Sequence, residues 1–514
     1  MSTTRKTTSI SLAISLALSI VLIAFLTYKD ILNYFFSNMD LTYLVFYWRI
    51  ESLHDVLRVF TEPWATGFYR PITTLSFSLD YAIWGLNPFG WQLTNLILHI
   101  LVSVLVFFVI VSLTKGELLI AWLSAVIFTT HPVLANDVQV IPYRQDIVPA
   151  IFILLTVILF LKYMSAESKK YYLFLSLLFC FFALGSKEIA VITPVIIFSY
   201  VIIFSEKKSF KNKTLNAVKI ALPFFLLAFL YVAWRAYLFR GFGGYGRYSN
   251  LPVWTNIKNY LAYLLDPVHL LHLGLTGAIL IIFFGLLIYR QEIKSSFTGS
   301  IYGKSVVFLL IWMLLPLAIL LYSLGYIDPR QAYMPAMPFS GVLSVVFVNN
   351  TKSTFQKLGR LNTSFIKSLI ASLMTLCLIA YLFIYSPLIK NYREVENCGK
   401  ICKIVLYKLL EIVPKMQADG TIYITNLPIN VYPRGASPVL DGSCFEDGNY
   451  KKFIDYYYPG NRVKFVPQYT IWNIDTDYPL NVDSDMRLEI RENKDKNAVE
   501  LDIKLLNKKI TISY

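Results

Sequence analysis

Long apolar runs limit this 514-residue chain to few kinds of fold. A helix needs about 20 apolar residues to cross the hydrocarbon core of a bilayer, and runs that approach or reach this length recur as far as residue 388. The predicted spans are 10–27, 92–114, 118–131, 147–163, 171–186, 189–205, 215–235, 275–289, 305–324, 333–349 and 368–388. The first run is too long for a signal peptide and is read as an uncleaved span. The sequence therefore predicts an all-α polytopic membrane protein with about eleven transmembrane helices.

Composition supports a membrane protein and excludes other classes. Apolar residues make up 56% of the chain and charged residues 15%, against about 45–50% and about 25% in soluble domains. These values exclude a soluble enzyme, a disordered chain and a nucleic-acid binder. The net charge of +15 does not require a polyanionic partner, because membrane proteins concentrate Lys and Arg in their cytoplasmic loops. No nucleic-acid partner is therefore expected.

The distribution of Lys and Arg predicts the orientation in the membrane. With the N-terminus inside, the segments predicted to lie inside hold 18 Lys and Arg in 66 residues, and the loops predicted to lie outside hold 11 in 129 residues. The roughly threefold higher density inside follows the positive-inside rule. The block 256–274 contains Asp266, Pro267 and two histidines, so it is predicted to be an interfacial or re-entrant helix that does not cross. An odd number of spans then places the C-terminus outside.

The chain ends in a polar tail, residues 390–514. A predicted helix near 400–415 is followed by five strand-like runs, TIYITNL, VKFVPQYTIWNI, RLEIRE, VELDIKLL and KKITISY. The sequence therefore predicts two domains, a transmembrane domain over 1–389 and a small extracytoplasmic α/β domain over 390–514. The tail has no histidine, so no zinc site is expected there. Three cysteines leave its disulfide pairing open: Cys398, Cys402 and Cys444.

Polar residues outside the tail gather in the loops predicted to lie outside. The first of these loops, 29–91, is long for a connection without a function. Charged residues near a bilayer persist when they pair or line a wet cavity. Convergent arginines suit a phosphate, because a guanidinium donates two parallel hydrogen bonds, and a carboxylate among them suits a general base. The pattern indicates a site for an anionic, membrane-borne ligand.

Each candidate also has a purely structural interpretation. Asp40 is in a position to cap the helix that follows it. The segment 144–146 fits an ion pair before a span, and 187–188 fits a solvated turn. His131 fits a span terminus before a proline. The glycine-rich run 241–246 lacks the lysine of a P-loop and fits a flexible loop better than a nucleotide cradle.

Five blocks resemble, in order, the motifs of membrane O-mannosyltransferases of the TMTC type and their prokaryotic relatives. They are YRPITTLSFSLDYAIWGLNPFGWQLTNLILHI (69–100), HPVLANDVQVIPYRQDIVPAIF (131–152), LGSKEIAVITPVIIFSY (184–200), RGFGGYG (240–246) and DPRQAYMPAMPF (328–339). The resemblance covers about residues 30–350. It implies a GT-C fold and an enzyme, similar also to PMT-like O-mannosyltransferases, that takes one sugar from a polyprenyl-phosphate carrier with inversion, outside the cytoplasm.

The resemblance also implies a catalytic residue. Relatives carry an acidic base soon after the first span, and the matching position here is Asp40, with Met39 where a second acid is often found. An inverting transfer also needs cations to hold the departing phosphate. The candidates for this role are Arg70, Arg144, Lys187 and Arg330. Orienting roles are assigned to Asp146, Glu188 and His131. Because the phosphate leaves as an anion held by cations, no metal or other cofactor is expected.

The predicted function is therefore a multi-pass membrane glycosyltransferase that moves a mannose-like sugar from a polyprenyl-phosphate donor to a protein or glycan acceptor. Two alternatives stay open: a lipid-linked saccharide transporter or flippase, and an enzyme of the O-antigen polymerase or ligase type. A transporter should have polar groups at the bilayer midplane and broken helices in related halves. Here the polar groups cluster on one side, and no half-repeat is visible. The sequence names neither the sugar nor the acceptor.

Overall fold

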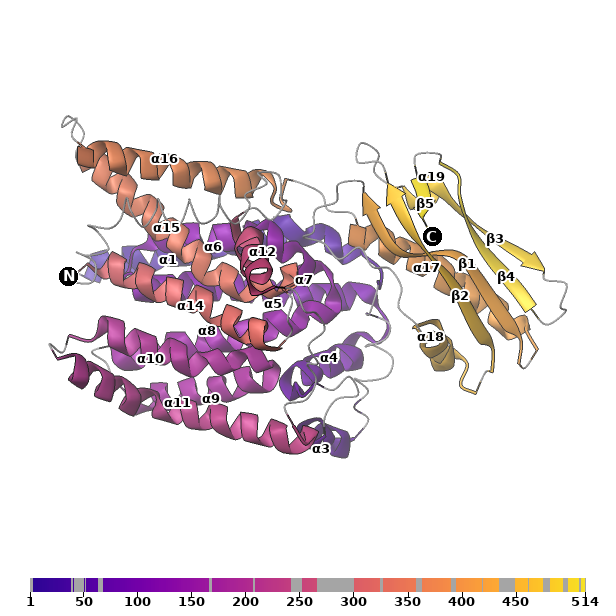
Figure 1. Ribbon diagram of the computed structural model, residues 1–514, viewed down its shortest axis with the longest axis horizontal. Helices are drawn as coiled ribbons and strands as arrows, with labels where there is room; N and C mark the ends of the chain where they lie inside the picture. Colours follow the sequence, from indigo (N-terminus) through magenta and orange to yellow (C-terminus); the bar gives the residue numbers. More distant parts are fainter. Residues whose placement is uncertain are drawn as a thin grey trace.

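The computed structural model shows a bundle of long helices with a smaller sheet, accompanied by its own helices, at one end of the bundle (Figure 1). The N-terminal helix begins at the end of the bundle away from the sheet (Figure 1). The residues that the structure describes are 3–37, 40, 50, 52–62, 68–165, 169–206, 209–241, 252–265, 300–323, 327–356, 363–389, 394–417, 419–433, 449–460, 462–474, 481–492, 498–507 and 510–513.

Apolar helices build the bundle. They are α1 (Thr3–Tyr28), α5 (Pro88–Leu113), α6 (Leu118–Thr130), α8 (Arg144–Met164), α9 (Lys170–Ser186), α10 (Thr193–Phe204), α11 (Phe210–Phe239), α14 (Ile301–Ser323), α15 (Tyr333–Gln356) and α16 (Thr363–Ile384). Every predicted span that falls on described residues coincides with one of these helices. The predicted span 275–289 lies outside the described residues.

Within the described part of the chain, six helical segments are long and apolar enough to cross a bilayer: Ile10–Asn33, Pro88–Leu113, Ile141–Met164, Phe210–Phe239, Ile301–Leu321 and Pro329–Phe355. A seventh is added if α6 and the helical stretch Pro132–Gln139, which meet at a bend of 51°, form one span. The prediction of a helical multi-pass membrane protein is confirmed. The predicted number of eleven spans is not confirmed, because the apolar stretches Lys170–Ser186, Glu188–Phe204 and Ser368–Ile384 are shorter.

The outermost helices present apolar side chains to their surroundings. Only 17% of the most apolar stretch of α1 and 22% of that of α11 is buried, against 83% for the stretch that contains α15. Leu18 and Phe229 are 63% and 67% exposed. Such continuous apolar surface is stable in contact with lipid and unfavourable in water. α1 and α11 therefore face the bilayer, and α15 lies in the centre of the bundle.

Short helices and helical turns fill the connections predicted as outside loops. Their bounds are η1 (Lys29–Asn33), α3 (Leu53–Thr61), α4 (Pro71–Trp84), η2 (Pro132–Leu134), α7 (Ala135–Gln139), η3 (Ile141–Tyr143), η4 (Glu188–Ile192), α12 (Val253–Leu265) and η5 (Pro329–Ala332). α12 has 13 residues, fewer than a span requires, and Figure 1 shows it nearly end-on among helices that run lengthwise. The remainder of the block predicted as interfacial, 266–274, lies outside the described residues.

The tail forms the predicted small α/β fold. Its elements are α17 (Glu394–Ile412), η6 (Val413–Lys415), β1 (Thr421–Pro433), α18 (Asn449–Tyr457), β2 (Lys464–Ile474), α19 (Val482–Asp485), β3 (Met486–Glu492), β4 (Ala498–Leu505) and β5 (Ile510–Ser513). The strand order is β3-β4-β1-β2-β5, with β1 parallel to β2 and β4, and with antiparallel strands β3 and β5 at the edges. Each strand-like run of the sequence is thus confirmed as a strand.

The core of the sheet part continues into the end of the bundle. One buried cluster contains these residues of α17 and the sheet: Ile401, Val405, Leu409, Ile422, Ile424, Leu501 and Ile503. The same cluster contains these residues of the bundle: Phe36, Phe77, Trp91 and Ile141. Burial of a shared apolar surface resists separation of the two parts. The division into domains at residues 389 and 390 remains a prediction.

Arg144 holds three helices of the bundle together. Its side chain is completely buried, and its Nη2 lies 2.5 Å from Asp80 Oδ2 in α4. The same nitrogen donates to the carbonyl oxygen of Trp91 in α5, Nε donates to Asn95 Oδ1 at 2.6 Å, and Nη1 donates to the carbonyl oxygen of Ser76 at 3.3 Å. A buried guanidinium persists only when its donors are satisfied in this way.

We expect Arg144→Met to lower the free energy of unfolding by about 3–5 kcal/mol, because it leaves the buried Asp80 carboxylate without its cation. The double variant Arg144→Met/Asp80→Leu removes both charges and should recover most of the loss. Thermal unfolding of the purified protein in detergent measures both effects. A single variant as stable as the wild type would contradict this structural role.

Candidate functional site

Charged side chains from six separate segments meet at the end of the bundle that carries the sheet. This charged cluster consists of Arg70, Asp137, Asp146, Lys187, Glu188, Arg235, Asp328 and Arg330. Its members sit at helix ends: before α4, in α7, in the first turn of α8, between α9 and η4, near the end of α11, and at η5. The first, second, third and fifth sequence blocks thus supply every member of the cluster except Arg235. Arg235 lies near the end of α11, shortly before the fourth, glycine-rich block.

Glu188 binds two arginines. Arg70 Nη2 lies 2.5 Å from Glu188 Oε1, and Arg70 Nε donates to Oε2 at 3.1 Å, which is a two-pronged contact. Arg235 Nη1 lies 3.3 Å from the same Oε2. Arg70 also donates to the side-chain oxygen of Gln145. Arg70 is the residue before Pro71, which starts α4, so this contact fixes the beginning of α4 against η4.

Lys187 and Asp146 form the second pair. Lys187 Nζ lies 2.5 Å from Asp146 Oδ1, and both side chains are largely buried. Asp146 is in the first turn of α8, where the positive end of the helix dipole favours a carboxylate. Its other oxygen, Oδ2, has no hydrogen-bond partner among the described residues. Asp146 Oδ2 is therefore available to accept a hydrogen bond inside the charged cluster.

Asp137 and Arg330 complete the cluster. Asp137 is fully buried, and neither of its carboxylate oxygens has a hydrogen-bond partner in the described part of the chain. Its electrostatic neighbours are Asp146, Lys187, Asp328 and Arg330. Arg330 Nε lies 3.4 Å from Asp328 Oδ2, and the guanidinium stacks 4.8 Å from the ring centre of Tyr143. Four cations thus face four carboxylates.

Asp40 lies apart from these pairs. It is fully buried, and its Oδ2 accepts from the backbone N–H of Ser37 at 2.6 Å and from the Ser37 hydroxyl at 3.3 Å. Its Oδ1 has no hydrogen-bond partner, and no cation pairs with Asp40 among the described residues. Burial raises the pKa of Asp40 from 3.8 to about 7, although the bonds from Ser37 act in the opposite direction. The carboxyl group therefore titrates near neutral pH.

The surroundings of Asp40 can be compared with the interpretation that it caps the following helix. The residues that follow it, 41–49, lie outside the described residues, so capping of a helix there is not tested. The structure instead shows the Asp40 carboxylate accepting a hydrogen bond from the backbone N–H of Ser37, three residues earlier. The acidic residue at the third helical position of a capping box makes the same contact. Cys402 of α17 interacts electrostatically with Asp40.

Two predicted residues have contacts that lie outside the charged cluster. Arg144 is engaged with α4 and α5, and its position gives no access to a ligand. His131 is fully buried; its Nε2 lies 3.1 Å from the carbonyl oxygen of Leu264 in α12, and its Nδ1 accepts from the N–H of Val133. Both ring nitrogens of His131 are therefore used to join α12 to η2.

Three members of the charged cluster were not among the predicted site residues: Asp137, Arg235 and Asp328. All three lie in or beside the loops predicted to lie outside, which is the signal that could have found them. Their sequence neighbours do not distinguish them from solvated loop charges. In the described residues no group of three or more His, Cys, Asp and Glu has the arrangement of a metal site.

We expect Asp40→Asn to stabilise the protein at alkaline pH. From about pH 4 to about pH 7 the unfolded chain has released the proton of Asp40 and the folded chain still holds it, so stability falls as the pH rises through this window. Asparagine carries no charge to bury. Its advantage in thermal unfolding should therefore be larger at about pH 8 than at about pH 5. An equal advantage at both values would contradict the raised pKa.

Comparisons with known proteins give short sequence matches. No family model matches the chain. It is 35% identical over 99 residues to the human protein O-mannosyl-transferase TMTC2, a match that covers 19% of this chain and 12% of that protein. The mouse TMTC1 enzyme matches at 34% over 95 residues, which is 18% and 10% of the two chains, and the human TMTC4 enzyme at 35% over 117 residues, which is 20% and 15%.

The matches confirm the resemblance to TMTC-type O-mannosyltransferases, and they span only about an eighth of the length of those proteins. Distant structural similarities extend further. ArnT from Cupriavidus metallidurans bound to undecaprenyl phosphate has a TM-score of 0.45 and 10% identity, with 94% of this chain and 96% of that chain covered. The oligosaccharyltransferase of Archaeoglobus fulgidus has a TM-score of 0.40 and 11% identity, with 88% and 62% covered.

Proposed function

We propose that this protein is a membrane glycosyltransferase of the GT-C type that transfers a sugar, mannose-like, from a polyprenyl-phosphate carrier to an extracytoplasmic protein or glycan acceptor with inversion. The observation that carries the proposal is the charged cluster at one end of an apolar bundle. A lipid carrier reaches such a site from the bilayer, and its phosphate meets cations where the helices end. The sequence similarity to O-mannosyltransferases supports the same reaction class.

The donor phosphate binds to Arg70, Lys187 and Arg330 in this proposal. Arg144 is left out, because its guanidinium is buried and engaged within the bundle. Since the cluster holds equal numbers of cations and carboxylates, an arriving phosphate must draw a cation away from its partner. Arg330 is best placed to move, because its contact of 3.4 Å is the longest of these pairs and its side chain is 20% exposed, the most of the three.

Asp40 acts as the general base. It takes the proton from the acceptor hydroxyl while the oxygen attacks the anomeric carbon of the sugar. The bond from that carbon to the phosphate oxygen breaks, and polyprenyl phosphate leaves with the electron pair. A carboxyl group with a pKa of about 7 suits a base that works near neutral pH. Because Asp40 is buried in this structure, its surroundings must open for the acceptor to reach it.

Metal independence belongs to this proposal. Arginine and lysine side chains neutralise the charge that develops on the departing phosphate, so the chemistry does not demand a Lewis acid. The alternative of a transporter receives less support, since transport sites need polar groups near the middle of the membrane. The charged cluster is instead built from helix ends.

The sheet part lies outside the cytoplasm with Asp40 in this proposal. α17 packs against the segment that ends in Asp40, so the two belong to the same side of the membrane. Cys398 of α17 is disulfide-bonded, and disulfides persist in oxidising compartments outside the cytoplasm. The Lys and Arg distribution of the sequence supports the same orientation.

We expect Asp40→Asn to reduce turnover by roughly 10²–10⁴-fold, because it keeps the shape of the side chain and removes the base. The assay follows consumption of several polyprenyl-phosphate sugars by the purified protein. Asp30→Asn is the matched control, since Asp30 is an exposed acid of the same segment, and it should retain normal turnover. Normal turnover by Asp40→Asn would refute the base assignment, and failure of the wild type to consume any donor would refute the function.

The orientation has its own test. A single cysteine placed at exposed Lys415, in a chain in which all five native cysteines are replaced by serine, should react with a membrane-impermeant maleimide in intact cells. A cysteine at exposed Lys352, in the connection predicted to lie inside, should react only after the cells are broken. The opposite pattern would place the sheet in the cytoplasm.

A further inference from the structure

One face of α17 follows the chain from the end of α1 to Asp40. At its start, Val395 is buried in a cluster with Tyr28, Ile31 and Tyr34. One turn later, Gly399 lies so close to this segment that a Cβ there would be 2.8 Å from the carbonyl oxygen of Phe35. Any larger residue would push the two backbones apart.

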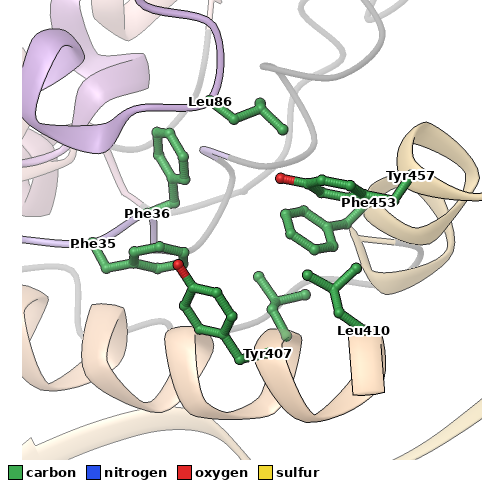
Figure 2. Close-up of a pocket in the computed structure, with 8 residues that line it drawn as sticks. Phe35, Phe36, Leu86, Tyr407, Leu410, Phe453 and Tyr457 are labelled. Atoms are coloured by element: carbon green, nitrogen blue, oxygen red, sulfur yellow. The ribbon is translucent and has the colours of Figure 1, made fainter. Parts of the chain in front are cut away.

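The same face of α17 brings Cys402 within electrostatic range of the candidate base. Cys402 is a free thiol, only 1% exposed, and burial together with the nearby Asp40 carboxylate raises its pKa well above the ordinary value. Beyond it, Tyr407 packs on Phe35 with ring centres 6.2 Å apart. Figure 2 shows Phe35 and Phe36 facing the side chains of α17 across a small cleft, which Leu406 also lines.

The spacing of these contacts shows that they form one stripe. Val395, Gly399, Cys402 and Leu406 are separated by four, three and four residues, which places them on the same face of a helix. A neighbouring buried face of α17 packs on the sheet through Ile401 and other residues of the shared core. The helix therefore transmits the position of the sheet part to the segment that carries Asp40.

We propose that this stripe of α17 positions Asp40 for catalysis, and that Cys402 is the positioning residue that covers the carboxylate. The inference rests on the proposed function, in which Asp40 is the base. It makes the C-terminal part a component of the catalytic apparatus. Among the described residues, the backbone N–H and hydroxyl of Ser37 donate to Asp40, and Cys402 is the titratable group that interacts with it electrostatically.

Disulfide trapping tests the geometry without any activity. In the full-length chain, Asp40→Cys should form a disulfide with native Cys402 under mild oxidation, detected by mass spectrometry of the digested protein. The matched control is Asp40→Cys/Cys402→Ser/Lys403→Cys, which moves the thiol by one residue to the exposed side of α17 and should give no such link. Absence of the link to Cys402, or an equal yield in the control, would overturn the proposal.

The pH profile of turnover tests the positioning role. Turnover should fall as the pH drops through the pKa of Asp40, because the base must be deprotonated. A serine hydroxyl is a stronger donor than a thiol, and a hydrogen bond from the hydroxyl introduced in Cys402→Ser to the unpartnered Oδ1 of Asp40 would favour the charged carboxylate, so this acid limb should move down by roughly one pH unit. Cys402→Ala, which adds no donor, should not move it down.

The outcomes separate this inference from the function on which it rests. If Asp40→Asn is inactive but the acid limb of Cys402→Ser coincides with that of the wild type, the positioning role is wrong and the base assignment stands. If Asp40→Asn turns over normally, both the base assignment and the positioning role are wrong. A uniform loss of turnover in both Cys402 variants, with no change in the acid limb, would show a merely structural contact and would also overturn the inference.

Discussion

A charge enclosed by apolar helices needs a counter-ion at contact distance, and this requirement organises the end of the bundle. Asp80 and Arg144 join α4 to α8 across 64 residues of sequence, and Arg70 and Glu188 join the start of α4 to η4 across 118 residues. Neither pair could separate without leaving a buried charge unpaired. Arg70, which holds the start of α4 against η4, is also one of the cations that the proposed function assigns to the donor phosphate.

The protein keeps two kinds of carboxylate close to one membrane surface. Glu188 and Asp146 are paired with cations, which suits them to hold arginine and lysine side chains in place. Asp40 has no such partner in the described structure and titrates near neutral pH. In the proposed function, this difference in environment separates a binding role from a proton-transfer role, although all three residues are acids in predicted outside loops.

The local features of the fold could be predicted from the sequence, and the long-range contacts could not. Hydropathy located the bundle helices, and alternation located the strands, because both depend on neighbouring residues. Arg70 and Arg144 look alike in sequence, yet one lies in the charged cluster and the other is enclosed between helices. Cys402 interacts electrostatically with Asp40 although 361 residues intervene, and no local sequence pattern reports such a long-range interaction. Asp137 was missed for the same reason.

The stereochemistry of the transfer distinguishes direct displacement by the acceptor from a covalent sugar intermediate on the protein. The purified protein is given a polyprenyl-phosphate sugar of defined anomeric configuration, and the configuration of the transferred sugar is determined by NMR. A single base and a departing phosphate predict direct displacement, so the product should have the opposite anomeric configuration and one equivalent of polyprenyl phosphate should be released. Retention of configuration would contradict the account, because it requires a covalent sugar intermediate on a nucleophile that this mechanism does not contain.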